Sequence, residues 1–122
     1  MAHIKVPAGL PGIIGPMSAY PETAKPMNEL AQNLLSRESS TLSKADRETI
    51  ASYVSFLNDC QFCSESHGAV ADYHIKQIGF SRQLWKDIES APISERLKSL
   101  LRIAAKVQKA ARSVTASDVE GA

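Results

Sequence analysis

Apolar residues recur three and four positions apart along most of the chain after residue 20, and this spacing predicts amphipathic helices. The first such segment, residues 21–36, begins at Pro21, which suits the first helical position. Pro26 does not suit a helix interior, so we expect a kink there or a start nearer Lys25. No segment combines strand-like alternation with hairpin signals, and the pattern therefore predicts an all-α fold.

Serine, threonine or aspartate precedes each later apolar segment, as is typical of a helix N-cap. The expected helix starts are Ser43, Asp59, Ser81, Ser94 and Thr115. Ser43 and Thr115 each have an aspartate three residues later, which is a variant of the capping box. Gly79 is expected to close the helix that begins after Asp59, as a glycine at the C′ position.

The first twenty residues differ in composition from the rest of the chain. They hold three of the six glycines and three of the six prolines, a density of breakers that predicts no helix. Their apolar residues argue against a free tail, so we expect an ordered, extended N-terminal arm that lies over the core or over a neighbouring subunit. The chain is therefore divided into an arm, residues 1–20, and a helical core domain, residues 21–122.

Charge and hydropathy narrow the function classes. Fourteen Lys and Arg against thirteen Asp and Glu give a net charge of +1, which removes the electrostatic argument for nucleic acid or an anionic membrane as the main partner. No apolar run has the length of a membrane span, and the start lacks a signal-peptide pattern, so we expect a cytoplasmic protein. A basic stripe on residues 94–111 is either an anion-binding surface or a solvated helix face. It consists of Lys98, Arg102, Lys106 and Lys109.

The two cysteines, Cys60 and Cys63, are the residues most informative about chemistry. Three positions apart on a helix, they share a face and come close enough for a disulfide after modest adjustment. The nearby helix N-terminus favours a thiolate. His67 falls one turn after Cys63 and can take its thiol proton. Glu48 can orient that imidazole if the preceding helix folds back alongside.

Two structural interpretations of the same segment stay open. The cysteines can be core packing, or Cys60, Cys63 and His67 can bind zinc with His74 or Glu65 as the fourth ligand. Covalent haem is excluded, because it needs a histidine directly after the second cysteine and Ser64 stands there. Glu65 and Asp72 are otherwise expected to face solvent.

A glutamate, eleven residues, and then Cys-x-x-Cys-x-x-x-His resembles the core motif of the alkylhydroperoxidase D-like proteins of the carboxymuconolactone decarboxylase superfamily. The segment with the sequence DRETIASYVSFLNDCQFCSESHGAVA is similar to the peroxidase-related branch, and the flanking segments agree with this resemblance. The resemblance implies an orthogonal helical bundle that assembles as a homo-oligomer. It also implies a thiol peroxidase without cofactor or metal, which reduces small hydroperoxides and is restored by an external dithiol. Members of this branch run past Ala122, so the chain is expected to lack the family's C-terminal helices.

The resemblance also assigns roles to residues. Cys63 matches the cysteine that attacks the peroxide, Cys60 matches the resolving cysteine, and His67 and Glu48 match the proton relay. Phe62 stands where the best-known members have a histidine between the cysteines, which leaves the relay incomplete and implies a low rate. The decarboxylases of the superfamily generally lack the cysteine pair, so decarboxylation is not expected. The alternative function is a non-enzymatic oligomerisation or zinc-binding module in which the motif is structural.

Overall fold

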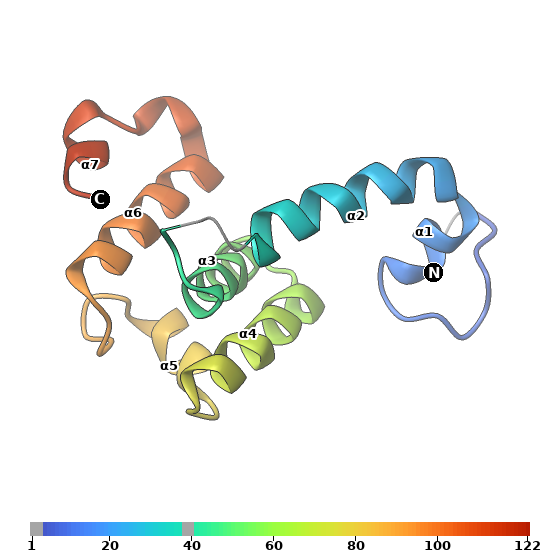
Figure 1. Ribbon diagram of the computed structural model, residues 1–122, viewed down its shortest axis with the longest axis horizontal. Helices are drawn as coiled ribbons and strands as arrows, with labels where there is room; N and C mark the ends of the chain where they lie inside the picture. Colours follow the sequence, from blue (N-terminus) through green and yellow to red (C-terminus); the bar gives the residue numbers. More distant parts are fainter. Residues whose placement is uncertain (1–3, 38–40) are drawn as a thin grey trace. The chain divides into compact units, whose positions relative to one another are not determined.

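A computed structural model of the chain describes residues 4–37 and 41–122, and every regular element in those ranges is helical (Figure 1). The all-α prediction is therefore confirmed. The chain divides into two compact units, Met1–Ser39 and Ser40–Ala122. The division of the sequence at residue 20 into arm and core domain stays a prediction.

The first unit contains two helices, α1 (Ile14–Ala19) and α2 (Pro21–Ser36). The prediction that the first twenty residues form no helix is wrong for α1. Gly9 and Gly12, which have positive φ, lie before this helix and not within it. Pro21 occupies the first turn of α2 as predicted.

The expected start of α2 near Lys25 is wrong, because the helix runs through Pro26. Proline lacks the amide that would donate to the carbonyl four residues earlier. The amide of Ala24, two residues before Pro26, donates to the Tyr20 carbonyl at 3.0 Å. Helical hydrogen bonding therefore begins on the N-terminal side of the proline. Pro26 therefore removes one bond close to the helix start and does not divide the helix.

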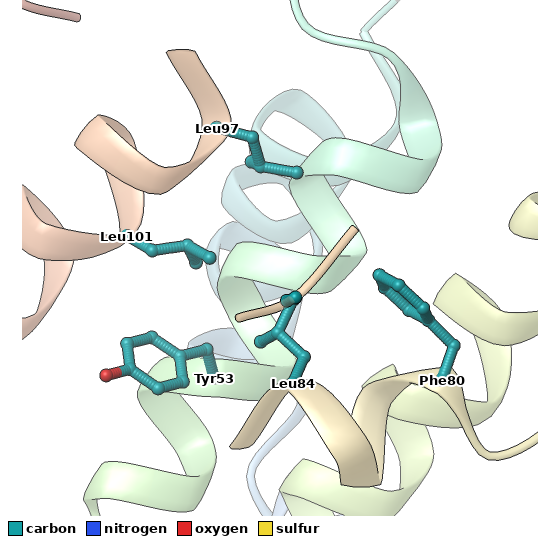
Figure 2. Close-up of a cluster of buried hydrophobic side chains, with 6 residues drawn as sticks. Tyr53, Phe80, Leu84, Leu97 and Leu101 are labelled. Carbon is teal, nitrogen blue, oxygen red and sulfur yellow. The ribbon is translucent and has the colours of Figure 1, made fainter. Parts of the chain in front are cut away.

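The second unit holds the remaining helices around one hydrophobic core. They are α3 (Lys44–Leu57), α4 (Gln61–Ile75), α5 (Phe80–Lys86), α6 (Glu95–Ala110), the 3-10 turn Ala111–Ser113 and α7 (Ala116–Glu120). Side chains from α3, α5 and α6 meet in this core (Figure 2). Its buried members are Tyr53, Phe80, Leu84, Ala91, Leu97 and Leu101. Helix α3 also packs along α4, so it is the element that joins the core to α4.

Three of the predicted N-caps are confirmed. The Ser43 hydroxyl accepts from the Asp46 amide at 3.0 Å, and the Asp46 carboxylate accepts from the Ser43 amide at 3.1 Å. Thr115 and Asp118 form the same capping box at the start of α7. Ser94 accepts from the Leu97 amide at the start of α6.

The predicted boundaries of α4 and α5 are wrong in three places. Asp59 has φ 54°, in the left-handed region and not in the extended conformation of an N-cap, and Cys60 takes the N-cap position of α4 instead. Lys76 and not Gly79 holds the left-handed position that ends α4. Gly79, with φ 82°, precedes α5, so Ser81 lies inside that helix and does not cap it.

The cap of α5 comes from a distant residue. The Asp72 carboxylate, on α4, accepts from the amides of Gly79 and Ser81 and also from the Ser81 hydroxyl. The expectation that Asp72 faces solvent is therefore wrong. One carboxylate satisfies two amides at the start of α5 and fixes that helix against α4.

The basic stripe of α6 is largely paired with acidic residues. Lys98 lies 2.9 Å from Glu95, Arg102 binds Glu89, and the Lys106 ammonium lies 2.6 Å from the Asp118 carboxylate. The observations favour an ion-paired helix face over an anion-binding surface. Within the described ranges no helix is both long and apolar enough to cross a membrane.

The Lys106–Asp118 pair predicts how α7 responds to acid. The Lys106 ammonium, with the Thr115 amide and hydroxyl, lowers the pKa of Asp118 from 3.8 to about 2. A carboxyl with a lowered pKa in the folded chain stabilises the fold above its ordinary pKa, and this stabilisation is lost as pH falls towards the lowered value. In Lys106→Gln the pKa of Asp118 should rise towards 3.8, and α7 should lose order at a higher pH than in the wild-type chain.

An NMR titration of the Asp118 carboxyl and the Val119 amide measures both effects. Lys109→Gln removes one positive charge from the same helix and is the matched control. An equal upward shift of the Asp118 pKa in the control would show that the general charge of α6, and not the contact with Lys106, is responsible.

Candidate active site

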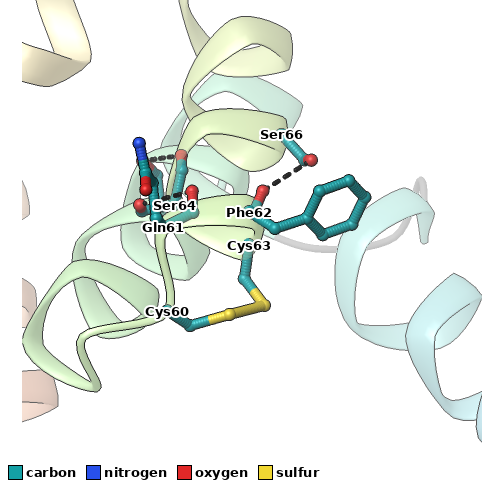
Figure 3. Close-up of a disulfide and its surroundings, with 7 residues drawn as sticks. Cys60, Gln61, Phe62, Cys63, Ser64 and Ser66 are labelled. Carbon is teal, nitrogen blue, oxygen red and sulfur yellow. Dashed lines mark hydrogen bonds between the residues drawn. A yellow bond between two sulfur atoms is a disulfide. The ribbon is translucent and has the colours of Figure 1, made fainter. Parts of the chain in front are cut away.

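The cysteine pair lies in the first turn of α4, where the chain re-enters a helix after the tight turn at Asn58 and Asp59. Cys60 is the N-cap residue and Cys63 the third helical residue, and their sulfur atoms are joined in a disulfide (Figure 3). Their Cα atoms lie 5.4 Å apart, within the range that a disulfide spans. The sequence prediction that this spacing permits a disulfide is confirmed.

The backbone of this turn is held at Cys60 through both its amide and its carbonyl. The Cys60 amide donates to the Ser55 carbonyl at 3.0 Å, and the Cys60 carbonyl accepts from the Ser64 amide at 2.9 Å. The Cys60 side chain makes no capping hydrogen bond. Both sulfur atoms therefore belong to the positive end of the α4 dipole, which stabilises a thiolate in the reduced pair.

A glutamate–histidine pair lies one helical turn beyond Cys63. His67 Nδ1 is 2.8 Å from Glu48 Oε2. Glu48, on α3, is only 5% exposed, whereas the His67 side chain is 31% exposed. The carboxylate can accept from Nδ1–H, and this tautomer leaves Nε2 with a free lone pair. Since His67 follows Cys63 by one helical turn, the arrangement offers a base near that sulfur.

The close approach of α4 to its neighbours is made possible by Gly68. A Cβ atom at this position would lie 3.2 Å from Ser52 Oγ, from Ser81 Cβ and from Trp85 Cζ2. These atoms belong to α3 and α5, so a Cβ at position 68 would require them or α4 to shift by a few tenths of an ångström. Gly68 directly follows His67, and the same approach brings Glu48 within hydrogen-bond distance of the imidazole.

The opposite flank of α4 carries a cavity of about 380 Å³ between α4 and α5. Its lining includes Glu65, Asp72, Tyr73, Arg82 and Trp85. The Arg82 guanidinium donates to the Glu65 carboxylate through Nε, at 3.1 Å, and through Nη2, at 2.8 Å. Glu65 therefore makes a salt bridge, which its sequence position had not indicated. The cavity does not reach the cysteines or His67.

The structure brings together some of the sequence-predicted residues and separates others. Glu48 joins His67, and Cys60 joins Cys63, whereas Glu65 lies on another flank of α4 and His74 is exposed with an edge contact to Tyr73. Among the described residues no three of His, Cys, Asp and Glu gather as a metal-binding group. Sequence reasoning missed Ser52 and Gly68, because their importance comes from contacts between helices and not from a local motif.

Comparison with known proteins gives two kinds of match. The model of the carboxymuconolactone decarboxylase family matches residues 21–72, a range that includes Glu48, both cysteines and His67. The solved structure of an alkylhydroperoxidase AhpD core, an uncharacterized peroxidase-related protein from Ralstonia eutropha JMP134, matches with a TM-score of 0.82 at 27% sequence identity. The matched region covers 93% of this chain and 60% of the chain from Ralstonia eutropha JMP134.

A second solved structure, an uncharacterized peroxidase-related protein from Silicibacter sp. TM1040, has a TM-score of 0.77 and 28% identity. The matched region covers 87% of this chain and 56% of the Silicibacter chain. The present chain thus spans less than two thirds of the length of either relative. No curated protein matches the sequence. The resemblance inferred from the motif is confirmed: the chain has the alkylhydroperoxidase-like fold, and its residues 21–72 match the model of the carboxymuconolactone decarboxylase family.

The Glu48–His67 contact predicts the reactivity of the reduced cysteines. Glu48→Gln keeps the shape of the side chain but removes the negative charge that contacts the His67 imidazole. Alkylation of Cys63 by iodoacetamide near neutral pH should slow by roughly three- to tenfold, since less of the thiol is ionised. The rate is measured by mass spectrometry on the reduced chain across pH 5–9.

Glu65→Gln is the matched control, because it makes the same substitution on the flank of α4 that faces Arg82. It should leave the alkylation profile unchanged. Identical profiles for wild type and Glu48→Gln would show that the helix terminus alone activates the thiol.

Proposed function

We propose that this chain is the catalytic part of a thiol peroxidase that reduces hydroperoxides through Cys60 and Cys63. The observation that carries the proposal is the coincidence of two pairs on one face of α4: a cysteine pair within disulfide distance, and one turn later a histidine held by a buried glutamate. The AhpD-like, peroxidase-related fold supports the same reaction class.

In the proposed mechanism, the Cys63 thiolate attacks the terminal oxygen of the hydroperoxide. An S–O bond forms, the O–O bond breaks, and the alkoxide leaves with a proton supplied by His67, giving an alcohol and a sulfenic acid on Cys63. The Cys60 thiol then attacks the Cys63 sulfur: the S–S bond forms, the S–O bond breaks, and the hydroxide leaves with the thiol proton as water. An external dithiol restores both thiols by two exchange steps and becomes a disulfide itself.

The assignment of Cys63 as the attacking residue is supported by the position of His67. Cys60 lies nearer the end of the helix and gains more from the helix dipole. Cys63, however, is one turn from the imidazole, and a base within reach of the thiol outweighs a partial charge. Phe62, between the two cysteines, is 54% exposed and supplies no proton-transfer group, so we expect a modest turnover rate.

The partners and compartment belong to the same proposal. We assign a small hydroperoxide as oxidant, a dithiol protein or molecule as reductant, and a second copy of the chain as the assembly partner. A pair that must be reduced in every cycle needs a compartment rich in dithiols, which the cytoplasm provides. The proposal includes no metal or cofactor.

The two cysteines should differ when they are replaced one at a time. Cys63→Ser should abolish consumption of an organic hydroperoxide, because the attacking sulfur is gone. Cys60→Ser should reduce one equivalent of peroxide per chain and then stop, with a sulfenic acid on Cys63 that dimedone traps. Dimedone on Cys60 instead, or equal loss of the first turnover in both variants, would reverse the assignment.

The exposed apolar side chains of the first unit predict self-association. Ile14, Met27 and Leu30 are each more than 40% exposed, and burial of such side chains favours association. Light scattering at micromolar concentration should show at least a dimer, which Leu30→Lys weakens. Gln32→Lys adds the same charge at an exposed polar position of α2 and is the control. A stable wild-type monomer would contradict the assembly proposal.

A further inference from the structure

We propose that Ser52 is a positioning residue for the cysteine pair: its hydroxyl holds the first turn of α4 against α3 and α5 and thereby favours the disulfide over the dithiol. The inference deepens the proposed function, because it concerns the redox balance of the same two cysteines. It requires only that the pair can be reduced and reoxidised.

The Ser52 hydroxyl joins three helices. It lies on α3, is completely buried, and donates to the Ser64 carbonyl of α4 at 3.0 Å. The same oxygen accepts from the Trp85 indole Nε1 of α5, also at 3.0 Å. The serine therefore has both a donor and an acceptor partner, and each partner comes from a different helix. A buried hydroxyl satisfied in this way fixes the relative positions of the groups that it joins.

The carbonyl that Ser52 binds belongs to the turn that carries the cysteines. Ser64 directly follows Cys63, its amide donates to the Cys60 carbonyl at 2.9 Å, and its hydroxyl donates to the Gln61 carbonyl at 3.0 Å. Ser64 thus closes the turn from Cys60 to Cys63 through its own polar groups, and Ser52 anchors Ser64 from outside the helix. The cysteine backbone is connected to α3 by this path.

Trp85, the other partner of Ser52, is also held by a contact of its own. Its ring stacks on Phe56, one turn after Ser52 on α3, with ring centres 5.4 Å apart and planes 10° apart. Gly68 allows the indole, the serine and α4 to approach this closely. An alanine at position 52 would leave the Trp85 Nε1–H and one lone pair of the Ser64 carbonyl without their partner.

This anchor has a consequence for the redox equilibrium. Disulfide formation requires the two cysteines to give up backbone and side-chain freedom. Where the turn is already fixed, the dithiol has less freedom to lose, so the disulfide is favoured more. Without the anchor, the dithiol gains freedom that the cross-linked turn cannot gain, and the equilibrium moves towards the reduced form.

The experiment equilibrates the chain with defined ratios of reduced to oxidised dithiothreitol and measures the fraction of disulfide by alkylation and mass spectrometry. Ser52→Ala should be half reduced at a ratio about fivefold lower than the wild-type chain, as expected if one of the two hydrogen bonds that it loses, the bond to the Ser64 carbonyl, stabilises the disulfide form alone. Ser66→Ala is the matched control. Its hydroxyl also donates to a backbone carbonyl of this turn, that of Phe62 at 2.7 Å (Figure 3), but within α4 alone and at an exposed position. The control should shift the midpoint by less than about twofold.

A midpoint for Ser52→Ala equal to that of the wild type, or an equal shift in Ser66→Ala, overturns the role of Ser52. If Ser52→Ala does not fold by circular dichroism, Trp85→Phe decides the question. This variant removes the indole N–H but keeps an aromatic ring beside Phe56, and it should shift the midpoint in the same direction by a smaller factor. No shift in Trp85→Phe then overturns the proposal. Since no peroxide enters the measurement, its result is independent of whether the chain reduces hydroperoxides.

Discussion

The close packing of α4 against α3 is the contact on which the candidate site depends. Gly68 provides the space for it, since a Cβ atom there would lie 3.2 Å from Ser52, Ser81 and Trp85 atoms. Because the helices approach this closely, the buried Glu48 carboxylate reaches His67. The cysteine pair itself is local to one helical turn, but the base beside it is assembled from two helices.

Three of the polar contacts around α4 join it to another helix. Glu48 comes from α3, the Asp72 carboxylate of α4 caps α5, and the Ser52 hydroxyl binds groups from α4 and α5. Buried polar groups are stable only when they are paired, so each of these bonds restricts how the three helices can pack. The Thr49 hydroxyl is the exception among the described buried side chains, since no partner is found for it, and nothing in the structure explains this.

The sequence predicted what local chemistry determines. The capping boxes at Ser43 and Thr115 were correct because a serine or threonine with an aspartate three residues later satisfies its own helix start. The motif spacing likewise predicted the Cys60–Cys63 pair and the Glu48–His67 pair. The cap of α5 could not be found in this way, because Asp72 lies in a different helix and its function depends on how α4 and α5 pack. Asp59 was misplaced since a tight turn, and not residue type alone, decides which residue becomes the N-cap.

The disulfide joins residues only three positions apart, and a cross-link this short removes little freedom from an unfolded chain. The hydrophobic core of the second unit, formed by α3, α5 and α6, does not include either cysteine. Reduction therefore opens a small ring at the edge of the scaffold and leaves the elements that hold it in place. Under the proposed function, the pair can therefore take up and release two electrons while the rest of the fold stays intact.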